Sequence, residues 1–133
     1  QLLENEPDLQ ERLSLPGVSG SMESWYTRAN VFILPSRYEG FPNVLLEAMA
    51  AGCACIASDC LTGPADLIRH GENGLLLSPQ ATTADWVEAI AGLLADPNRC
   101  LQLGEKAMEV RERYDAVRLR RDFLEALRKL HHG

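Results

Sequence analysis

The chain has 133 residues, of which 46% are hydrophobic, and this length and composition suit one domain with a single core rather than a disordered segment. Its net charge of −6, from 13 basic and 19 acidic side chains, argues against a general nucleic-acid-binding surface. No apolar run approaches the ~20 residues that a membrane-spanning helix needs. Because the chain opens on Gln1 rather than on Met, we expect it to be part of a longer protein.

The first predicted elements are a short strand and a short helix. Residues 12–15, RLSL, are predicted as a strand that stops at a Pro-Gly pair. Residues 21–29 are predicted as a helix, in which Trp25, Tyr26 and Ala29 have the spacing of one buried face.

Two apolar strands then flank a helix. Residues 30–35, NVFILP, form a continuous β-branched run, which is typical of a strand buried on both faces. Asn43 is a good helix cap, residues 44–51 are rich in helix formers, and Gly52 is suited to end the helix. The run CACIAS, residues 53–58, is predicted as the next strand.

The remainder is a turn-rich segment, a strand and a helical tail. Residues 59–74 indicate a loop, a short helix and a glycine turn, and residues 75–78, LLLS, indicate a strand. Helices are predicted over 83–95 and 98–112. The first of these is expected to bury Trp86, Val87, Ile90, Leu93 and Leu94. A last helix is expected to bury Ala116, Leu119, Phe123, Leu127 and Leu130.

Strands that alternate with helices predict an α/β fold, a Rossmann-like parallel sheet flanked by helices on both faces. No linker divides the chain, so we predict a single domain over residues 1–133. In such a sheet, ligands bind beyond the carboxyl ends of the strands. The loops over 36–42 and 58–64 leave two strands in that way, and we expect both at one edge of the sheet.

Two glutamates border the first of these loops. A helix that begins at Asn43 presents unpaired backbone N–H groups, which favour an anion such as a phosphate. Glu47 lies one turn further along, roughly 6 Å along the helix axis, and its carboxylate is expected over Asn43 and Val44, where it can accept hydrogen bonds from a vicinal diol. Glu39 is expected on the other side of the helix start. The alternative from spacing alone is that solvent or backbone satisfies either glutamate.

The stretch PSRYEGFPNVLLEAMAAG, residues 35–52, followed by CACIASD and GENGLLL, resembles the retaining glycosyltransferases of family 4. The resemblance covers about residues 12–79, with several motifs in the same order and spacing. Members of that family have two lobes of the GT-B type. The resemblance therefore implies that this chain is the later part of the C-terminal, donor-binding lobe, without the N-terminal acceptor lobe.

The resemblance also assigns roles to single residues. Glu39 falls on the catalytic position beside the transferred sugar, and Glu47 falls on the position that binds the nucleotide ribose. The backbone that contacts the donor sugar and diphosphate corresponds to Gly40, Phe41, Pro42 (carbonyl only), Asn43 and Val44. Pro16 and Val18 are weaker candidates for contact with the nucleotide base.

The sequence departs from the family pattern in places. Pro42 stands where the family often has glycine, which removes one amide donor. Asp66 stands where many members have glutamate, and we assign it no role. The basic pair that holds the diphosphate in the family belongs to a segment upstream of this chain, and nothing identifies Arg37 as its substitute.

The function that follows is retaining transfer of a sugar from a nucleotide-diphosphate donor, with UDP-sugar as the expected donor, to an acceptor hydroxyl. The acceptor, a sugar, a lipid-linked sugar or a polysaccharide, would bind through the missing lobe. No cofactor is expected, and no metal, since no D-x-D pair occurs. Two alternatives stay open: a non-catalytic nucleotide- or protein-binding module, and a glycoside hydrolase that uses both carboxylates. A dinucleotide oxidoreductase is disfavoured, because no G-x-G occurs.

The remaining polar and reactive residues are interpreted as structural. The four cysteines lack the spacing of a zinc site and are expected to be structural, in a reducing, cytoplasmic compartment; they are Cys53, Cys55, Cys60 and Cys100. His70, His131 and His132 are expected at the surface, and Trp25 and Trp86 in packing. The basic C-terminal segment suggests a solvated helix face or contact with the inner face of a membrane. As an isolated part of a lobe, the chain is expected to self-associate through exposed apolar surface.

Overall fold

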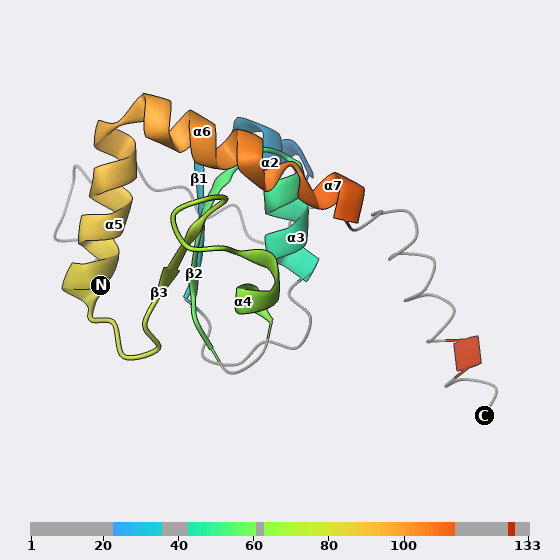
Figure 1. The fold of residues 1–133 in the computed structure, drawn as a ribbon, viewed down its shortest axis with the longest axis horizontal. Helices are drawn as coiled ribbons and strands as arrows, with labels where there is room; N and C mark the ends of the chain where they lie inside the picture. Colours follow the sequence, from blue (N-terminus) through green and yellow to red (C-terminus); the bar gives the residue numbers. More distant parts are fainter. Residues whose placement is uncertain (1–22, 36–42, 61–62, 114–127, 130–133) are drawn as a thin grey trace, which may run out of the picture.

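The computed structural model describes residues 23–35, 43–60, 63–113 and 128–129 of the chain (Figure 1). In chain order the elements are α2 (Glu23–Arg28), β1 (Val31–Leu34), α3 (Asn43–Ala50), β2 (Ala54–Ser58), α4 (Pro64–Leu67), β3 (Leu75–Leu77), α5 (Thr83–Ala95), α6 (Pro97–Ala107) and α7 (Val110–Arg113). The alternation of strands and helices that the sequence predicts is therefore present. The predicted strand over 12–15 and most of the predicted last helix lie outside the described residues.

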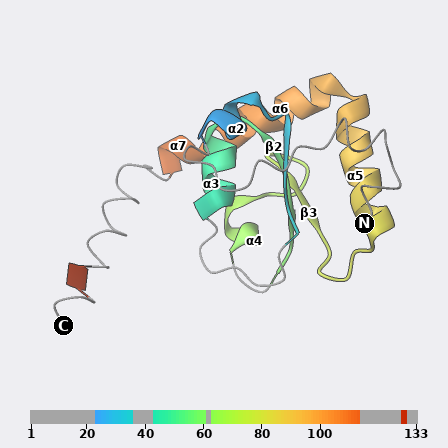
Figure 2. The ribbon, with the colours of Figure 1, turned by 180° about the vertical axis from the view of Figure 1, so that it is seen from behind.

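The described strands form one parallel sheet in the order β1-β2-β3. In its register Leu34 pairs with Ala57, and Ser58 pairs with Leu77, so the three strands end close to the same level. Figures 1 and 2 show α3 and α4 on one face of the sheet, α5 on the other, and α6 across the amino ends of the strands. The prediction of an α/β fold with a parallel sheet covered on both faces is confirmed.

The central strand β2 is buried along its whole length. Cys53, Cys55 and Ala57 pack into the cluster under α3, whereas Ala54 and Ile56 pack into the cluster under α5 and α6. This alternation is what a strand buried on both faces must show, because successive side chains point to opposite faces. The small side chains let helices approach closely from both sides.

The edge strand β1 corrects one expectation. Its apolar run predicts burial on both faces, but Ile33 is 43% exposed and the other residues of the strand are only half-buried. Among the described strands, β1 pairs with β2 alone. A run of apolar residues shows that a strand can be buried, but the layers around it decide whether both faces are covered.

Helix α5 corrects a second one. Leu93 is buried, and Trp86 and Ile90 pack partly against the same cluster. Val87 and Leu94 were predicted to be buried but are 58% and 61% exposed. They lie seven residues apart, on a stripe that faces away from the sheet, because a single helix buries only about one face.

The helices at either end of the described chain also differ in extent from the prediction. The helix predicted over 98–112 is divided into α6 and α7, and α2 ends before Ala29, which is exposed. Tyr26 is buried and Trp25 half-buried, so the predicted apolar face of α2 is only partly correct. No helix in the described ranges combines the length and the hydropathy needed to cross a bilayer.

The close approach of α6 to the sheet depends on Gly104. A Cβ at position 104 would overlap the carbonyl oxygen of Gly52, which ends the turn before β2. Backbone cannot move aside as a flexible side chain does, so only glycine fits there. This contact sets α6 across the amino end of β2.

We predict that Gly104→Ala lowers the free energy of unfolding by about 1–3 kcal/mol, because the added methyl group forces α6 away from β2. Gly92→Ala is the matched control: Gly92 also lies inside a helix, α5, but a Cβ there meets nothing within 4 Å. That change should raise stability by about 0.5–1 kcal/mol through helix propensity. Urea denaturation of both variants measures the difference, and equal effects would contradict the overlap.

Candidate functional site

The candidate site lies at the start of α3, beyond the carboxyl end of β1. In Figure 1 the first turns of α3 and α4 lie at the same end of the sheet as the ends of β1 and β2. The helix begins at Asn43, as predicted from the sequence. Its first backbone N–H groups have no acceptor within the helix, so they and the positive end of the helix dipole favour an anion.

Helix α3 has one buried side and one open stripe. Leu45, Leu46, Ala48 and Met49 are buried in the cluster against the sheet. Over residues 44–50 of this helix, the exposed residues are Val44, at 40%, and Glu47, three positions on. Residues three apart lie on neighbouring positions of the helix surface, so this pair forms a continuous stripe open to solvent. Glu47 is therefore not a buried carboxylate within the core but the polar member of that stripe.

The far end of α3 is fixed by a set of backbone and side-chain bonds. Gly52 has a positive φ of 88°, and its N–H donates to the Met49 carbonyl at 3.0 Å. The Cys53 N–H donates to the Ala48 carbonyl at 3.1 Å, which completes a Schellman motif. The Arg111 Nε of α7 donates to the Ala50 carbonyl at 2.7 Å. The roll of α3, and so the direction in which Glu47 points, is held by these contacts.

Tyr26 lies buried beside this helix, with only 3% of its surface exposed. Its ring contacts Phe32 edge to face, with centroids 5.8 Å apart at 77°. The hydroxyl oxygen is buried and has no hydrogen-bond partner. Burial above all, and then the nearby Glu47 carboxylate by its charge and as an acceptor, raise the pKa of Tyr26 to about 12. The two groups are thus neighbours, although no hydrogen bond of ordinary geometry joins them.

The sequence indicates Tyr26 only as a packing residue. A signal for more was present, because a buried tyrosine brings a hydroxyl that normally needs a partner. Helical spacing identifies the buried face of α2, but it does not say that the hydroxyl reaches the flank of α3. Only the tertiary contact between α2 and α3 brings the two residues together.

Several predicted site residues lie outside the described residues, and their placement stays a prediction. These are Glu39, Gly40, Phe41, Pro42, Pro16 and Val18; Arg37, to which no role is assigned, also lies outside the described residues. The structure places Val44 and Glu47 together on the open stripe of α3, with Asn43 as the first residue of that helix. Asp66 lies on α4 and is exposed, and no contact assigns it a role.

The cysteines within the described ranges form no disulfide. Cys53, Cys55 and Cys60 are buried and Cys100 is half-buried. The Cys53 Sγ donates to the Tyr26 carbonyl at 3.1 Å, and burial raises the pKa of the thiols of Cys53, Cys55 and Cys100. A raised pKa keeps these thiols protonated, and a protonated thiol is a poor nucleophile or ligand. The structural interpretation is supported for these cysteines.

His70 is exposed, as predicted, and has a definite structural role. Its Nδ1 accepts a hydrogen bond from the Leu76 N–H at 3.0 Å, which ties the turn before β3 to the strand. His131 and His132 lie outside the described residues. Within those residues, no three His, Cys, Asp or Glu side chains gather as a metal site would require.

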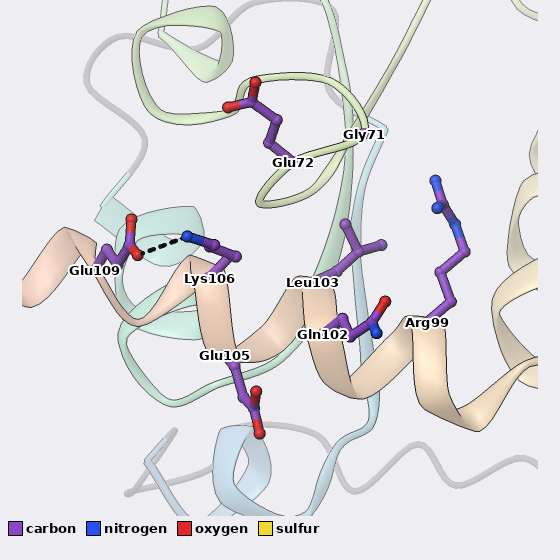
Figure 3. Close-up of a pocket in the computed structure, with 8 residues that line it drawn as sticks. All are labelled: Gly71, Glu72, Arg99, Gln102, Leu103, Glu105, Lys106 and Glu109. Carbon is purple, nitrogen blue, oxygen red and sulfur yellow. Dashed lines mark hydrogen bonds and ion pairs between the residues drawn. The ribbon is translucent and has the colours of Figure 1, made fainter.

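A cavity of about 490 Å³ opens at the opposite end of the sheet (Figure 3). It lies between the turn that precedes β3 and the surface of α6, which crosses the amino ends of the strands. In Figure 3 the Lys106 Nζ faces Glu109, at 3.2 Å, and Glu105 points to the other side of α6 from Glu72. Because ligands of parallel sheets bind at the carboxyl ends, this cavity is not the candidate site.

Comparison with known proteins decides the family. Residues 1–96 match the family described as "Glycosyl transferases group 1". The chain belongs to the group 1 glycosyl transferases. The matched region includes the stretch from Pro35 to Gly52, and with it the candidate site on α3.

Two relatives and one solved structure illustrate which known proteins are similar to this chain. An exopolysaccharide phosphotransferase of Streptomyces coelicolor is 45% identical over 109 residues, which are 81% of this chain and 12% of that protein. A D-inositol 3-phosphate glycosyltransferase of Thermobispora bispora is 32% identical over 124 residues, which are 90% of this chain and 28% of that protein. The crystal structure of Anabaena HepE in complex with UDP has a TM-score of 0.77 at 22% identity, over 94% of this chain and 34% of that one.

The chain therefore has the fold of one part of this solved structure, and the solved structures that it resembles are GT-B glycosyltransferases. The chain spans 12% and 28% of the two relatives and 34% of the solved structure. The chain therefore corresponds to only one part of each of these longer proteins.

The raised pKa of Tyr26 predicts a loss of stability in alkali. The folded protein holds this phenol protonated up to about pH 12, whereas the unfolded chain releases the proton near the ordinary value of 10.0. Stability is thus fully present below pH 10 and falls as the pH rises from 10 to 12. In Tyr26→Phe this part of the fall should disappear.

Urea midpoints of the complete protein, measured between neutral pH and pH 11, test this prediction. Val110→Ala is the matched control, because Val110 belongs to the same buried cluster but does not titrate. The control should lower the midpoint equally at every pH and keep the alkaline slope. An unchanged slope in Tyr26→Phe would contradict the assignment of the raised pKa to this residue.

Proposed function

We propose that the complete protein transfers a sugar from a nucleotide-diphosphate donor to an acceptor hydroxyl with retention of anomeric configuration, as a member of family 4. In this proposal the chain is the donor-binding part of a C-terminal lobe, and an N-terminal lobe supplies the acceptor site. The observation that carries it is the open stripe of Val44 and Glu47 on the first turns of α3, within a segment that belongs to the group 1 glycosyl transferases.

The chemistry follows from the charges that develop during transfer. As the bond from the anomeric carbon to the leaving oxygen breaks, positive charge grows on the sugar and negative charge on the nucleoside diphosphate. Unpaired N–H groups at the start of α3 stabilise the diphosphate, with the backbone of Gly40–Val44 around it. Glu39 is proposed beside the anomeric carbon, where a carboxylate stabilises the developing positive charge.

Glu47 is proposed to bind the ribose. Glu47 lies about one turn, roughly 6 Å, along the helix axis from Asn43, which suits the distance between the two parts of a nucleotide. The two carboxylate oxygens accept one hydrogen bond from each hydroxyl of a vicinal diol. The exposure of Glu47 supports this role, because a ribose must reach it from solvent.

UDP-sugar is the proposed donor, and the solved Anabaena structure, which was determined with UDP, supports this choice. Pro16 and Val18 are proposed to border the base. We propose that no metal takes part. The acceptor, a sugar, a lipid-linked sugar or a polysaccharide, is proposed to bind through the other lobe, with the protein in the cytoplasm or at the inner face of the membrane. The relatives named for exopolysaccharide and inositol-phosphate chemistry favour transfer over hydrolysis or a purely non-catalytic role.

We predict that Glu47→Ala in the complete protein weakens UDP binding by about 10- to 100-fold, because hydrogen bonds to a charged group contribute about 1.5–3 kcal/mol. Calorimetric titration with UDP, GDP and ADP measures the loss and identifies the base. Glu105→Ala, which removes an exposed carboxylate from α6 at the far end of the sheet, is the matched control and should bind UDP normally. Normal UDP binding by Glu47→Ala would refute the ribose role.

Glu39→Ala is expected to separate transfer from binding. The variant should lose at least about 100-fold in kcat, since it removes a charge that acts mainly in the transition state. Its affinity for UDP should stay within a few-fold of the parent protein, because UDP lacks the transferred sugar. Radiolabelled sugar transfer and calorimetry give the two numbers. Equal losses of transfer and of UDP affinity would place Glu39 at the nucleotide instead of the sugar.

A further inference from the structure

We propose that Tyr26 is a positioning residue for Glu47. Its hydroxyl, buried beside α3, donates a hydrogen bond to the Glu47 carboxylate when a nucleotide is bound and so orients the two oxygens toward the ribose diol. This inference deepens the proposed function and rests on the ribose-binding role of Glu47.

The first observation is the unpaired hydroxyl itself. Only 3% of the Tyr26 surface is exposed, and its Oη has no hydrogen-bond partner among the described residues. A buried hydroxyl without a hydrogen bond costs free energy, whereas phenylalanine would fill nearly the same space without that cost. A partner that comes within hydrogen-bond distance only when a ligand is bound explains why the oxygen is present.

The second observation is that the phenol cannot turn away to find another partner. Its ring packs edge to face on Phe32, and its backbone carbonyl accepts a hydrogen bond from the Cys53 thiol at 3.1 Å. The same cluster includes Leu46 and Met49 of α3. The ring is thus packed inside this buried cluster, while Glu47 is an exposed side chain whose rotamers are free to change. Any new hydrogen bond must form by movement of the carboxylate toward the phenol.

The third observation is chemical. After burial, the charge of the Glu47 carboxylate is the next cause of the raised pKa of Tyr26, so the two groups lie close to each other although no hydrogen bond joins them. Because the pKa of the phenol is about 12, it is protonated at neutral pH and can donate a hydrogen bond to a carboxylate. A carboxylate has room for about four hydrogen bonds, so the phenol and both ribose hydroxyls can be accepted together. Binding loses less side-chain entropy when the carboxylate has one preferred orientation.

Tyr26→Phe in the complete protein tests the inference, because it removes one oxygen and leaves the ring. UDP affinity should fall by about 3- to 10-fold, the usual effect of one hydrogen bond. The urea midpoint at neutral pH should be unchanged or higher, since an unsatisfied hydroxyl is lost. A purely structural tyrosine would instead lower the midpoint and leave UDP affinity within error. Val110→Ala, in the same cluster but on α7, is the control that lowers the midpoint without changing UDP affinity.

A double-variant cycle separates this inference from the proposed function. In a Glu47→Ala background, Tyr26→Phe should have no further effect on UDP affinity. If Glu47→Ala alone leaves UDP binding intact, the proposed ribose role is refuted. If Glu47→Ala weakens binding but Tyr26→Phe does not, or the two losses simply add, only the positioning role is refuted.

A spectroscopic measurement gives a readout that does not depend on affinity. The protein is labelled with ¹³C at the tyrosine ring carbon that bears the oxygen, and Tyr26→Phe assigns the resonance. Saturating UDP should shift the Tyr26 resonance in the parent protein, because the phenol gains an acceptor. In Glu47→Ala, saturated with UDP, the shift should be absent. The same shift in both proteins would overturn the inference.

Discussion

The arrangement of this chain depends on the burial of β2 on both faces. Cysteine and alanine side chains alternate along the strand, and their small size allows α3 to pack on one face and α6 to reach the backbone at the amino end. At the bare backbone of Gly104 this approach has no tolerance for an added atom. Once β2 is packed in this way, the position of α3 against the sheet is set, and so is the stripe of α3 that stays open.

The same helix serves packing and binding through its two sides. Four residues of α3 are buried, while Val44 and Glu47 are left exposed three positions apart. A Schellman motif and Arg111 hold the far end of the helix, so that its first turn is presented at the carboxyl end of the sheet in one orientation. A rigid helix that is fixed at its distal end is a suitable support for a site built largely from backbone N–H groups. Where the packing leaves a polar atom unsatisfied, at Tyr26, the neighbour is a residue of the proposed site; local rules are expected to be broken at such places.

Much of this could be predicted from the sequence, and the reasons for success and failure are physical. The parallel sheet and the start of α3 at Asn43 follow from local signals: β-branched runs, a capping residue and helical spacing. The exposure of Ile33, Val87 and Leu94 could not be predicted, because apolar character says that a side chain can be buried and not that a neighbouring layer covers it. The close approach of Gly104 to Gly52 and the proximity of Tyr26 to Glu47 involve residues that are 52 and 21 positions apart. They depend on how whole elements pack against each other, and the periodicity of residues along one element contains no information on that packing.

The cavity beside α6 and the proposed site lie at opposite ends of the sheet, which indicates how the proposed site is built. The cavity lies at the amino end of the sheet, between α6 and the turn before β3, whereas the start of α3 lies at the carboxyl end. A ligand site between two lobes is built as an open surface on each of them and becomes concave only when the lobes face each other. The backbone N–H groups at the start of α3 and the open stripe of Val44 and Glu47 together suit one such surface. If the proposed function is correct, the donor is first held on an open surface, and a second lobe would complete the water-excluded environment that transfer needs.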